Sequence, residues 1–166
     1  MFKNLKERLK SAKKTVVAVS VCALLFMGAC GTAGGQNSDV NATLWSAPST
    51  VKYMLDDSPV SDYGENMNVS LAANEKESAQ LTVTPKTNVK NYEISISDLT
   101  GDNGHTVSKE NVSVFVEKYI NVSTVTTVFR AGYYPDALVP YDSVKQAKED
   151  RIKAGQNQTF LFTVYA

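Results

Sequence analysis

The sequence predicts an all-β domain, an antiparallel β-sandwich of the immunoglobulin/fibronectin-like type, preceded by a signal-peptide helix and a flexible tether. Apolar and polar residues alternate along most of the chain after residue 44, which is the period of half-buried strands. Turn-forming residues separate these runs at short intervals, as in "DDSP" and "LTGDNGHT". Helical periodicity is scarce. About seven short strands with turns at this spacing are typical of a sandwich.

The first 29 residues have the pattern of a signal peptide. Residues 1–14 carry six basic residues against Glu7 alone, and residues 15–29 carry no charge. As a helix, the uncharged segment would span roughly 22 Å, which is short for a hydrocarbon core about 30 Å thick. A basic flank before a short apolar segment is typical of a secretory signal.

The end of this segment, "FMGAC", resembles the lipidation motif of bacterial lipoproteins. Gly28 and Ala29 are small, Cys30 follows them, and Met27 stands where leucine is usual. We expect Cys30 to become the mature N-terminus and to carry palmitate, which anchors the chain to the outside of the bacterial cell membrane. Each buried methylene contributes about 0.8 kcal/mol, so two or more acyl chains hold stably. An ordinary secretory cleavage site or an uncleaved anchor is the alternative.

The mature chain excludes several classes of site. Cys22 leaves with the signal peptide, so no disulfide is expected, and one histidine (His105) cannot build a His-rich metal site. We therefore expect no metal and no cofactor. From Cys30 onward the chain keeps 11 basic and 16 acidic residues, a net charge of about −5. This balance argues against nucleic acid as a partner, because binding it requires basic patches.

After the anchor, residues 30–43 are small and polar, as expected of a flexible tether. Residues 44–166 then form the predicted sandwich domain, with Trp45 and Tyr53 in its core or at a seam. Strands are expected at residues 51–55, 67–73, 79–85, 92–99, 111–122 and 159–166. Residues 124–129 either continue the fifth strand or turn back. Residues 142–155 predict a short helix, with Asp142 or Ser143 as its cap and Gly155 as its stop.

The segment "RAGYYPDALVPYD", residues 130–142, is predicted as a loop and is the main candidate binding site. It carries Tyr133, Tyr134, Asp136 and Tyr141 among two prolines. Exposed aromatic rings beside carboxylates are a common way to hold sugars, since the rings stack and the carboxylates accept hydroxyl groups. The alternative is a loop whose tyrosines close the end of the sandwich or contact a neighbouring domain.

Two polar clusters carry weaker hypotheses. Glu75 and Glu77 could act as an acid–base pair, but a charged turn between two strands is favoured. Asp98, Asp102, Asn103 and Glu110 lie in or beside a loop whose oxygen ligands could hold Ca²⁺. That loop lacks the spacing of a helix–loop–helix calcium site, and "DNG" favours a hairpin turn instead. His105 in the same loop is expected to be exposed.

Six stretches, taken in order, resemble one family. They are "LWSAPSTVKYMLDD", "LAANEKESAQLTVTP", "YEISISDLTG", "VFVEKYINV", "GYYPDALVP" and "AGQNQTFLFTVYA". Together they resemble the N-terminal β-sandwich domain of secreted glycoside-hydrolase-like proteins related to glycoside hydrolase family 123. In that family a catalytic barrel follows the sandwich, whereas this sequence stops at Ala166. The resemblance therefore implies a truncated or split product, or a stand-alone accessory domain, without the catalytic carboxylates.

We therefore expect a non-catalytic, membrane-anchored accessory domain that docks against a separately encoded barrel or helps to present carbohydrate. The alternative is a free-standing carbohydrate-binding or adhesin-like module that uses the Tyr133–Asp142 segment. A small hydrolase using Glu75 and Glu77 is the third and weakest hypothesis. The last strand is fairly apolar on both faces, with Leu161 and Tyr165 opposite the core side. Such a strand expects cover on both faces, which predicts an exposed apolar patch near the C-terminus.

Overall fold

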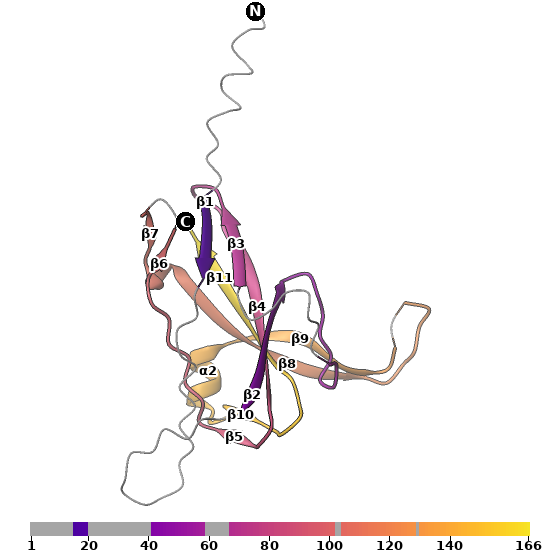
Figure 1. Ribbon diagram of the computed structural model, residues 1–166. Coiled ribbons are helices and arrows are strands. Elements are labelled where there is room, and N and C mark those ends of the chain that lie inside the picture. The colour runs from indigo at the N-terminus through magenta and orange to yellow at the C-terminus, as the bar shows by residue number, and fades with distance from the viewer. Residues whose placement is uncertain (1–14, 20–40, 59–66, 102–103, 129) are drawn as a thin grey trace, which may run out of the picture.

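The computed structural model describes residues 15–19, 41–58, 67–101, 104–128 and 130–166 (Figure 1). Its largest element is a five-stranded antiparallel sheet in the order β2-β4-β11-β8-β9. The strands are β2 (Ala42–Pro48), β4 (Lys76–Pro85), β8 (Val112–Val122), β9 (Gly132–Pro140) and β11 (Gln158–Tyr165). The chain is thus an all-β, sandwich-like fold, as predicted.

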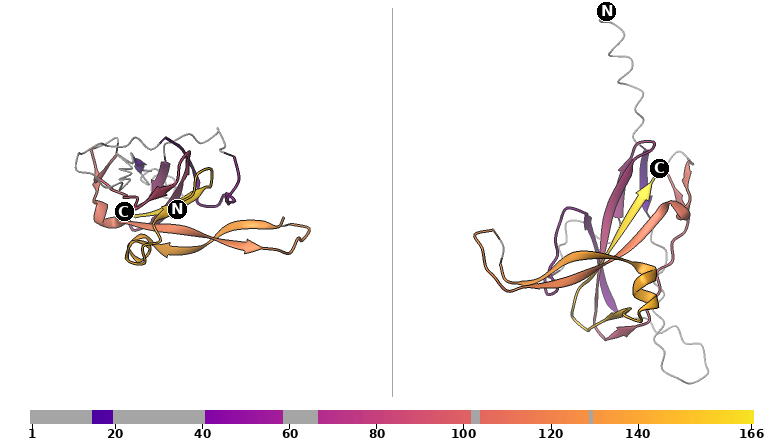
Figure 2. Two further views of the ribbon diagram at one scale, coloured as in Figure 1. Left: turned by 90° about the horizontal axis from the view of Figure 1, so that it is seen from below. Right: turned by 180° about the vertical axis from the view of Figure 1, so that it is seen from behind.

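Shorter elements cover one face of the large sheet. Three two-stranded antiparallel sheets pair β1 with β3, β5 with β10, and β6 with β7. Their bounds are β1 (Thr15–Val19), β3 (Met67–Leu71), β5 (Val89–Lys90), β6 (Leu99–Thr100), β7 (Thr106–Val107) and β10 (Arg151–Ile152). A 3₁₀ turn (Lys109–Asn111) precedes β8, and helix α2 (Tyr141–Gln146) follows β9. Figure 2 shows the β8–β9 pair along one side of the molecule, with α2 at one end.

The hydrophobic core lies between the large sheet and this second layer. Alternate residues of β11 point into it, and the ring of Phe160 meets the ring of Tyr92 edge-on at 5.3 Å between centroids. The strictly alternating burial of β3 puts Met67, Val69 and Leu71 against the same core. Burying one such side chain contributes about 1.5–3 kcal/mol. The period-two prediction for residues 67–71 and for β11 is confirmed.

The opposite face of the large sheet is covered near its middle by residues 49–57. Trp45, Ala47 and Tyr53 form a small buried cluster there, and the rings of Trp45 and Tyr53 lie 4.2 Å apart. Burial of both aromatic residues, expected from the sequence, is confirmed. Residues 51–55, however, are not a strand. Val51 N–H donates to the Pro48 carbonyl, so the chain turns at the end of β2 and crosses the sheet.

Two further predictions differ from the structure: the strand over residues 92–99 is missing except at Leu99, and the predicted short helix is present but shorter. Residues 93–98 form no strand, since Ile94 N–H donates to the Tyr141 hydroxyl rather than to a neighbouring backbone. The helix predicted over residues 142–155 ends at Gln146 and has Pro140 at its N-cap. Lys148 adopts a left-handed φ of 56°, which stops the helix, and Gly155 lies in a later turn.

The segment predicted as a loop, residues 132–140, is strand β9. It pairs with β8 from Val122↔Gly132 to Phe115↔Pro140, with an irregularity between Lys118 and Tyr119. Two prolines argue against a central strand, but β9 is at the edge of the sheet, where missing amide donors cost little. Asp136 is the unpaired residue at the irregularity, as in a β-bulge.

The N-terminal prediction is corrected in part. A helix was expected through the apolar segment, but Thr15–Val19 forms β1 and pairs with β3. Four of these five residues are Thr or Val, whose branched side chains favour strands. The rest of the predicted signal peptide and most of the tether, Cys30 included, lie outside the described residues. Ala42 and Thr43 belong to β2, so the sheet begins before residue 44. Among the described residues, no helix is long and apolar enough to span a membrane.

Candidate functional site

A two-stranded arm is the most prominent surface feature of the described chain. The distal halves of β8 and β9, with the described residues 123–128 and 130–131 that connect them, run out from the body, as both views show (Figures 1 and 2). Its large apolar side chains face solvent, with exposed fractions of 47% for Ile120, 69% for Val125, 79% for Val128 and 47% for Tyr133. Clustered exposed apolar residues of this kind mark interaction surfaces.

The segment that crosses the sheet, residues 51–57, fixes the base of this arm. Leu55 N–H donates to the Tyr133 carbonyl at 3.2 Å, and Lys52 Nζ donates to the Pro135 carbonyl at 2.9 Å. The Asp57 carboxylate also pairs with the Arg130 guanidinium. Three contacts from one short segment hold the β9 side of the arm, at Arg130, Tyr133 and Pro135. Val125 and Val128, between the two strands, stay exposed.

A glycine allows the crossing segment to approach the arm closely. Gly132 has a φ of 151°, and a Cβ added to it would collide with the end of the Met54 side chain. Met54 is itself buried. The φ of Gly132 disfavours any residue with a side chain at this position, and a larger residue would also require the end of the Met54 side chain to move.

The predicted site residues do not converge. Tyr133 and Tyr134 are neighbours on one strand and so point to opposite faces. The Tyr134 hydroxyl donates to the Arg130 carbonyl at 2.8 Å, and Asp136 is exposed at the bulge. Tyr141 lies eight positions beyond Tyr133, about 26 Å along an extended strand. The four residues thus form no single sugar-binding platform.

Tyr141 has a structural role at the start of α2. Its hydroxyl accepts from Ile94 N–H at 3.1 Å and donates to the Tyr92 carbonyl at 3.2 Å. Its ring stacks against that of Tyr92 at 6.2 Å. Burial raises the pKa of the Tyr141 phenol, and the Ile94 hydrogen bond partly opposes this rise. The residue clamps residues 92–94 to α2.

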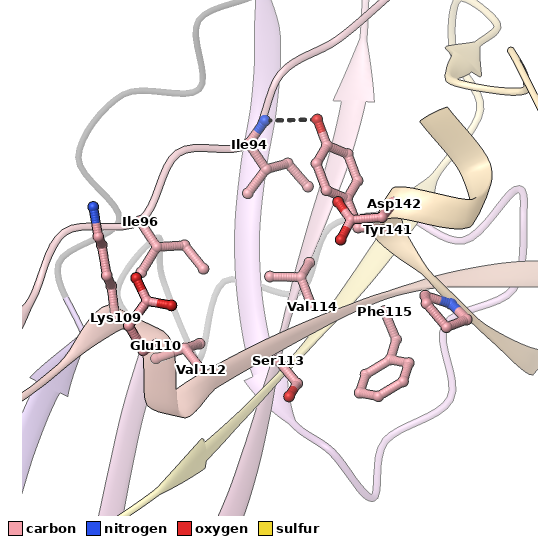
Figure 3. Close-up of a pocket in the computed structure, with 11 residues that line it drawn as sticks. Ile94, Ile96, Lys109, Glu110, Val112, Ser113, Val114, Phe115, Tyr141 and Asp142 are labelled. Carbon is pink, nitrogen blue, oxygen red and sulfur yellow. Dashed lines mark hydrogen bonds between the residues drawn. The ribbon is translucent and has the colours of Figure 1, made fainter. Parts of the chain in front are cut away.

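Tyr141 also lines a groove of about 670 Å³ between β8 and the segment before β6 (Figure 3). Figure 3 shows Ile94, Ile96 and Val114 turned into the groove, whereas Phe115 points away on the far side of β8. Lys109 and Glu110 lie at one end and Asp142 lies at the other. Its walls combine aliphatic side chains with polar groups, and the charged groups stand at its two ends.

A buried carboxylate lies beneath the crossing segment. Glu117 on β8 is 4% exposed, and its Oε2 atom has no hydrogen-bond partner among the described residues. Burial raises its pKa from 4.5 to about 7, and the charge of Lys52 opposes this rise. Tyr119 follows on the same face, where burial raises its pKa to about 12 and its hydroxyl lies 3.2 Å from Thr159 Oγ1.

The weaker candidate clusters lie in turns. Glu75 Oε2 accepts from Ala72 N–H at 2.8 Å and closes the turn before β4, while Glu77 lies within that strand. Asp98 Oδ1 accepts from Lys109 N–H at 2.9 Å, and His105 is exposed beside the β6–β7 turn. Asp102 and Asn103 lie outside the described residues. Within the described part of the chain, no group of three or more His, Cys, Asp or Glu side chains could hold a metal ion.

The apolar patch predicted near the C-terminus is present in a modest form. Tyr165 is 41% exposed, and Leu161 on the same strand face is half-buried. Lys76 Nζ lies 5.9 Å from the centre of the Tyr165 ring, and the Tyr165 hydroxyl reaches Asn74 Oδ1 at 3.3 Å. The exposed side chains of the arm are more numerous, and of these only Tyr133 was predicted from the sequence as a contact residue.

Comparison with known proteins adds no relative: no family model matches the chain, and no curated protein matches it.

Proposed function

We propose that this protein is a non-catalytic, lipid-anchored accessory β-sandwich of a glycoside-hydrolase-like system, which docks a partner domain through the β8–β9 arm. The observation that carries this proposal is the exposure of Val125 and Val128, 69% and 79%, on an arm whose base is fixed to the body. A fixed base with an exposed apolar tip presents a contact surface at a low entropic cost of ordering.

The candidate catalytic groups support a non-catalytic role. Glu75 closes a turn through the Ala72 amide, and Glu77 lies in β4. The charged residues of the groove stand at its rims. General acid–base catalysis needs two groups within reach of one substrate bond. The partner implied by the family resemblance is a separately encoded catalytic barrel.

The first test is whether a neighbouring reading frame encodes a catalytic barrel, and docking is then measured by co-purification of the chain with that barrel. Replacing Val125 and Val128 together by serine is expected to abolish co-purification. A matched control, Leu138→Ser, changes an apolar residue of β9 that is 49% exposed but lies nearer the body. Retention of the barrel by the double variant would contradict docking through the arm.

Anchoring at Cys30 is tested by labelling growing cells with radioactive palmitate. The wild-type chain and Cys22→Ser are expected to carry label and to partition with membranes, whereas Cys30→Ser carries none. The two cysteines lie eight positions apart in one precursor, so they form a matched pair. Label on the Cys30→Ser variant would exclude lipidation at this site.

A carbohydrate-binding role is the second candidate, because the Tyr133 ring is 47% exposed on the arm. In this alternative, the chain alone binds glycans and Tyr133→Ala abolishes the binding. Tyr134→Ala is the control, since its hydroxyl is already engaged by the Arg130 carbonyl. Equal loss in both variants would argue against a specific ring platform at Tyr133.

A further inference from the structure

Strand β3 has a single strand partner in the described part of the chain, and that partner belongs to the predicted signal peptide. β1 and β3 pair antiparallel over their full lengths, from Thr15↔Leu71 to Val19↔Met67. β1 also lies beside β6 in the second layer (Figure 1). Removal of β1 would leave a position one strand wide between β3 and β6.

Leaving this position empty would be energetically unfavourable for β3. Met67, Val69 and Leu71 of β3 are 2–4% exposed and belong to the hydrophobic core. An unpaired strand beside a core leaves amide and carbonyl groups without partners, and each such group costs about 1–3 kcal/mol if it is buried. An open strand edge also accepts a strand from another chain.

We propose that cleavage before Cys30 opens a strand-acceptor site on β3, and that this site takes an extended segment of a partner polypeptide. This inference rests on the lipoprotein processing proposed above. The chemistry of the occupant follows from β1 itself, which is five uncharged residues, Thr-Val-Val-Ala-Val, running antiparallel to β3. The partner segment is therefore extended, uncharged and rich in β-branched residues, and it binds by strand addition.

The site is tested on the chain that starts at residue 30, made directly with Cys30→Ser and compared with the full-length chain. Amide hydrogen exchange of Asn68, Val69 and Ser70 is measured with and without a synthetic peptide of residues 14–20, KTVVAVS. We expect rapid exchange without peptide. Excess peptide should slow exchange by at least about tenfold, equivalent to about 1.4 kcal/mol. The same peptide N-methylated at both Val16 and Val17 should have no effect, because the amides of adjacent strand residues point to opposite sides and one of these two faces β3.

Buried amides of β4 provide the internal control, since their protection shows that the large sheet is intact. If the shortened chain does not fold, full-length Val17→Pro replaces it, because proline at the centre of β1 removes an amide and disfavours pairing in place. The peptide is then expected to protect β3 in this variant and to leave the wild-type full-length chain unchanged.

Three results would overturn the inference. They are full protection of β3 in the monomeric shortened chain without peptide, protection gained only by dimerisation, and no response to the peptide in either variant. Failure of palmitate labelling at Cys30 would instead remove the cellular processing step. That outcome is distinct, because it leaves the measured peptide affinity of β3 unchanged.

Discussion

The two faces of the five-stranded sheet are covered to different extents and by different chemistry. On one face, Phe160, Phe162 and Val164 of β11 enter a continuous apolar core. On the other, Asn157, which directly precedes this strand, and Thr159 near its start form hydrogen bonds beneath residues 49–57. Apolar burial is non-directional, so the first face stabilises the domain but does not determine the position of a particular surface segment. The second face fixes one segment, and through it the base of the arm.

The polar face works because nearly every buried group has a partner. Thr82 Oγ1 and Thr159 Oγ1 lie 2.9 Å apart, and Gln80 Nε2 donates to the Pro48 carbonyl at 2.8 Å. Asn157 reaches two carbonyls of the crossing segment, at Met54 and Asp57. Such bonds are directional, so they determine where the segment lies. We therefore expect mutations on the apolar face to lower mainly the free energy of unfolding. Mutations on the polar face should also loosen the segment that crosses the sheet.

The largest effect is expected on the apolar face, for Phe160→Ala. Phe160 is 1% exposed, and its ring contacts Tyr92. Its removal should lower the free energy of unfolding by about 3–5 kcal/mol, because a cavity adds to the lost burial. Urea unfolding followed by fluorescence measures this change. Phe115→Ala, a half-buried ring on the opposite face of β8, is the control and should cost clearly less.

The next effect belongs to the polar face, for Asn157→Ala. The variant loses two donors to the Met54 and Asp57 carbonyls and an acceptor for the Thr84 hydroxyl. Leaving buried groups unpaired should cost about 2–3 kcal/mol. It should also speed amide exchange at Leu55, whose N–H donates to Tyr133. Asn88→Ala, which loses one exposed bond to Ala154, should change neither value by as much.

The sequence predicted the apolar face better than the polar one. Alternation located β3, β8 and β11, because a period of two reports directly on a half-buried strand. It failed for residues 51–55, whose Val-Lys-Tyr-Met-Leu pattern describes burial under a loop as well as it describes a strand. It also failed for β9, because Pro135 and Pro140 read as breakers although they lie in an edge strand.

The candidate site was less predictable still. Tyr133, Tyr134, Asp136 and Tyr141 were grouped because they are close in sequence, but a strand separates their faces and extends their spacing. Val125 and Val128 are exposed because the arm projects away from the rest of the domain. The amino-acid types in this segment do not predict that projection. The available signal was a run of β-branched residues, Thr124–Val128, that ends the alternation of β8.

The two faces should also differ in their response to pH, through Glu117. In the folded protein its pKa is about 7, raised by burial from 4.5. A raised folded-state pKa means that folding favours the protonated carboxyl, so its contribution is full below about pH 4.5 and is lost as pH rises through about 7. The stability of the wild-type chain should therefore fall between pH 5 and 8 by up to a few kcal/mol.

Glu117→Gln should flatten that pH dependence, as measured by melting temperature across this range, because glutamine stays neutral. The control is Glu149→Gln, whose exposed carboxylate pairs with Lys118 at 2.9 Å and has a lowered pKa. That lowering places its titration below the tested range, so the control should keep the wild-type slope. A slope that persists in Glu117→Gln would locate the titrating group elsewhere.

The smallest effect on stability is expected on the arm, for Val128→Ser. Val128 is 79% exposed, so little apolar area is lost and the free energy of unfolding should change by less than about 0.5 kcal/mol. Val116→Ser is the contrasting change, since Val116 is 0% exposed and the new hydroxyl would enter the core. The melting temperatures of the two variants compare a core valine with an arm valine on the same hairpin, and the loss should be larger for Val116→Ser. A large loss of stability in Val128→Ser would show that the tip packs against the body, and the arm would then not be free to dock a partner.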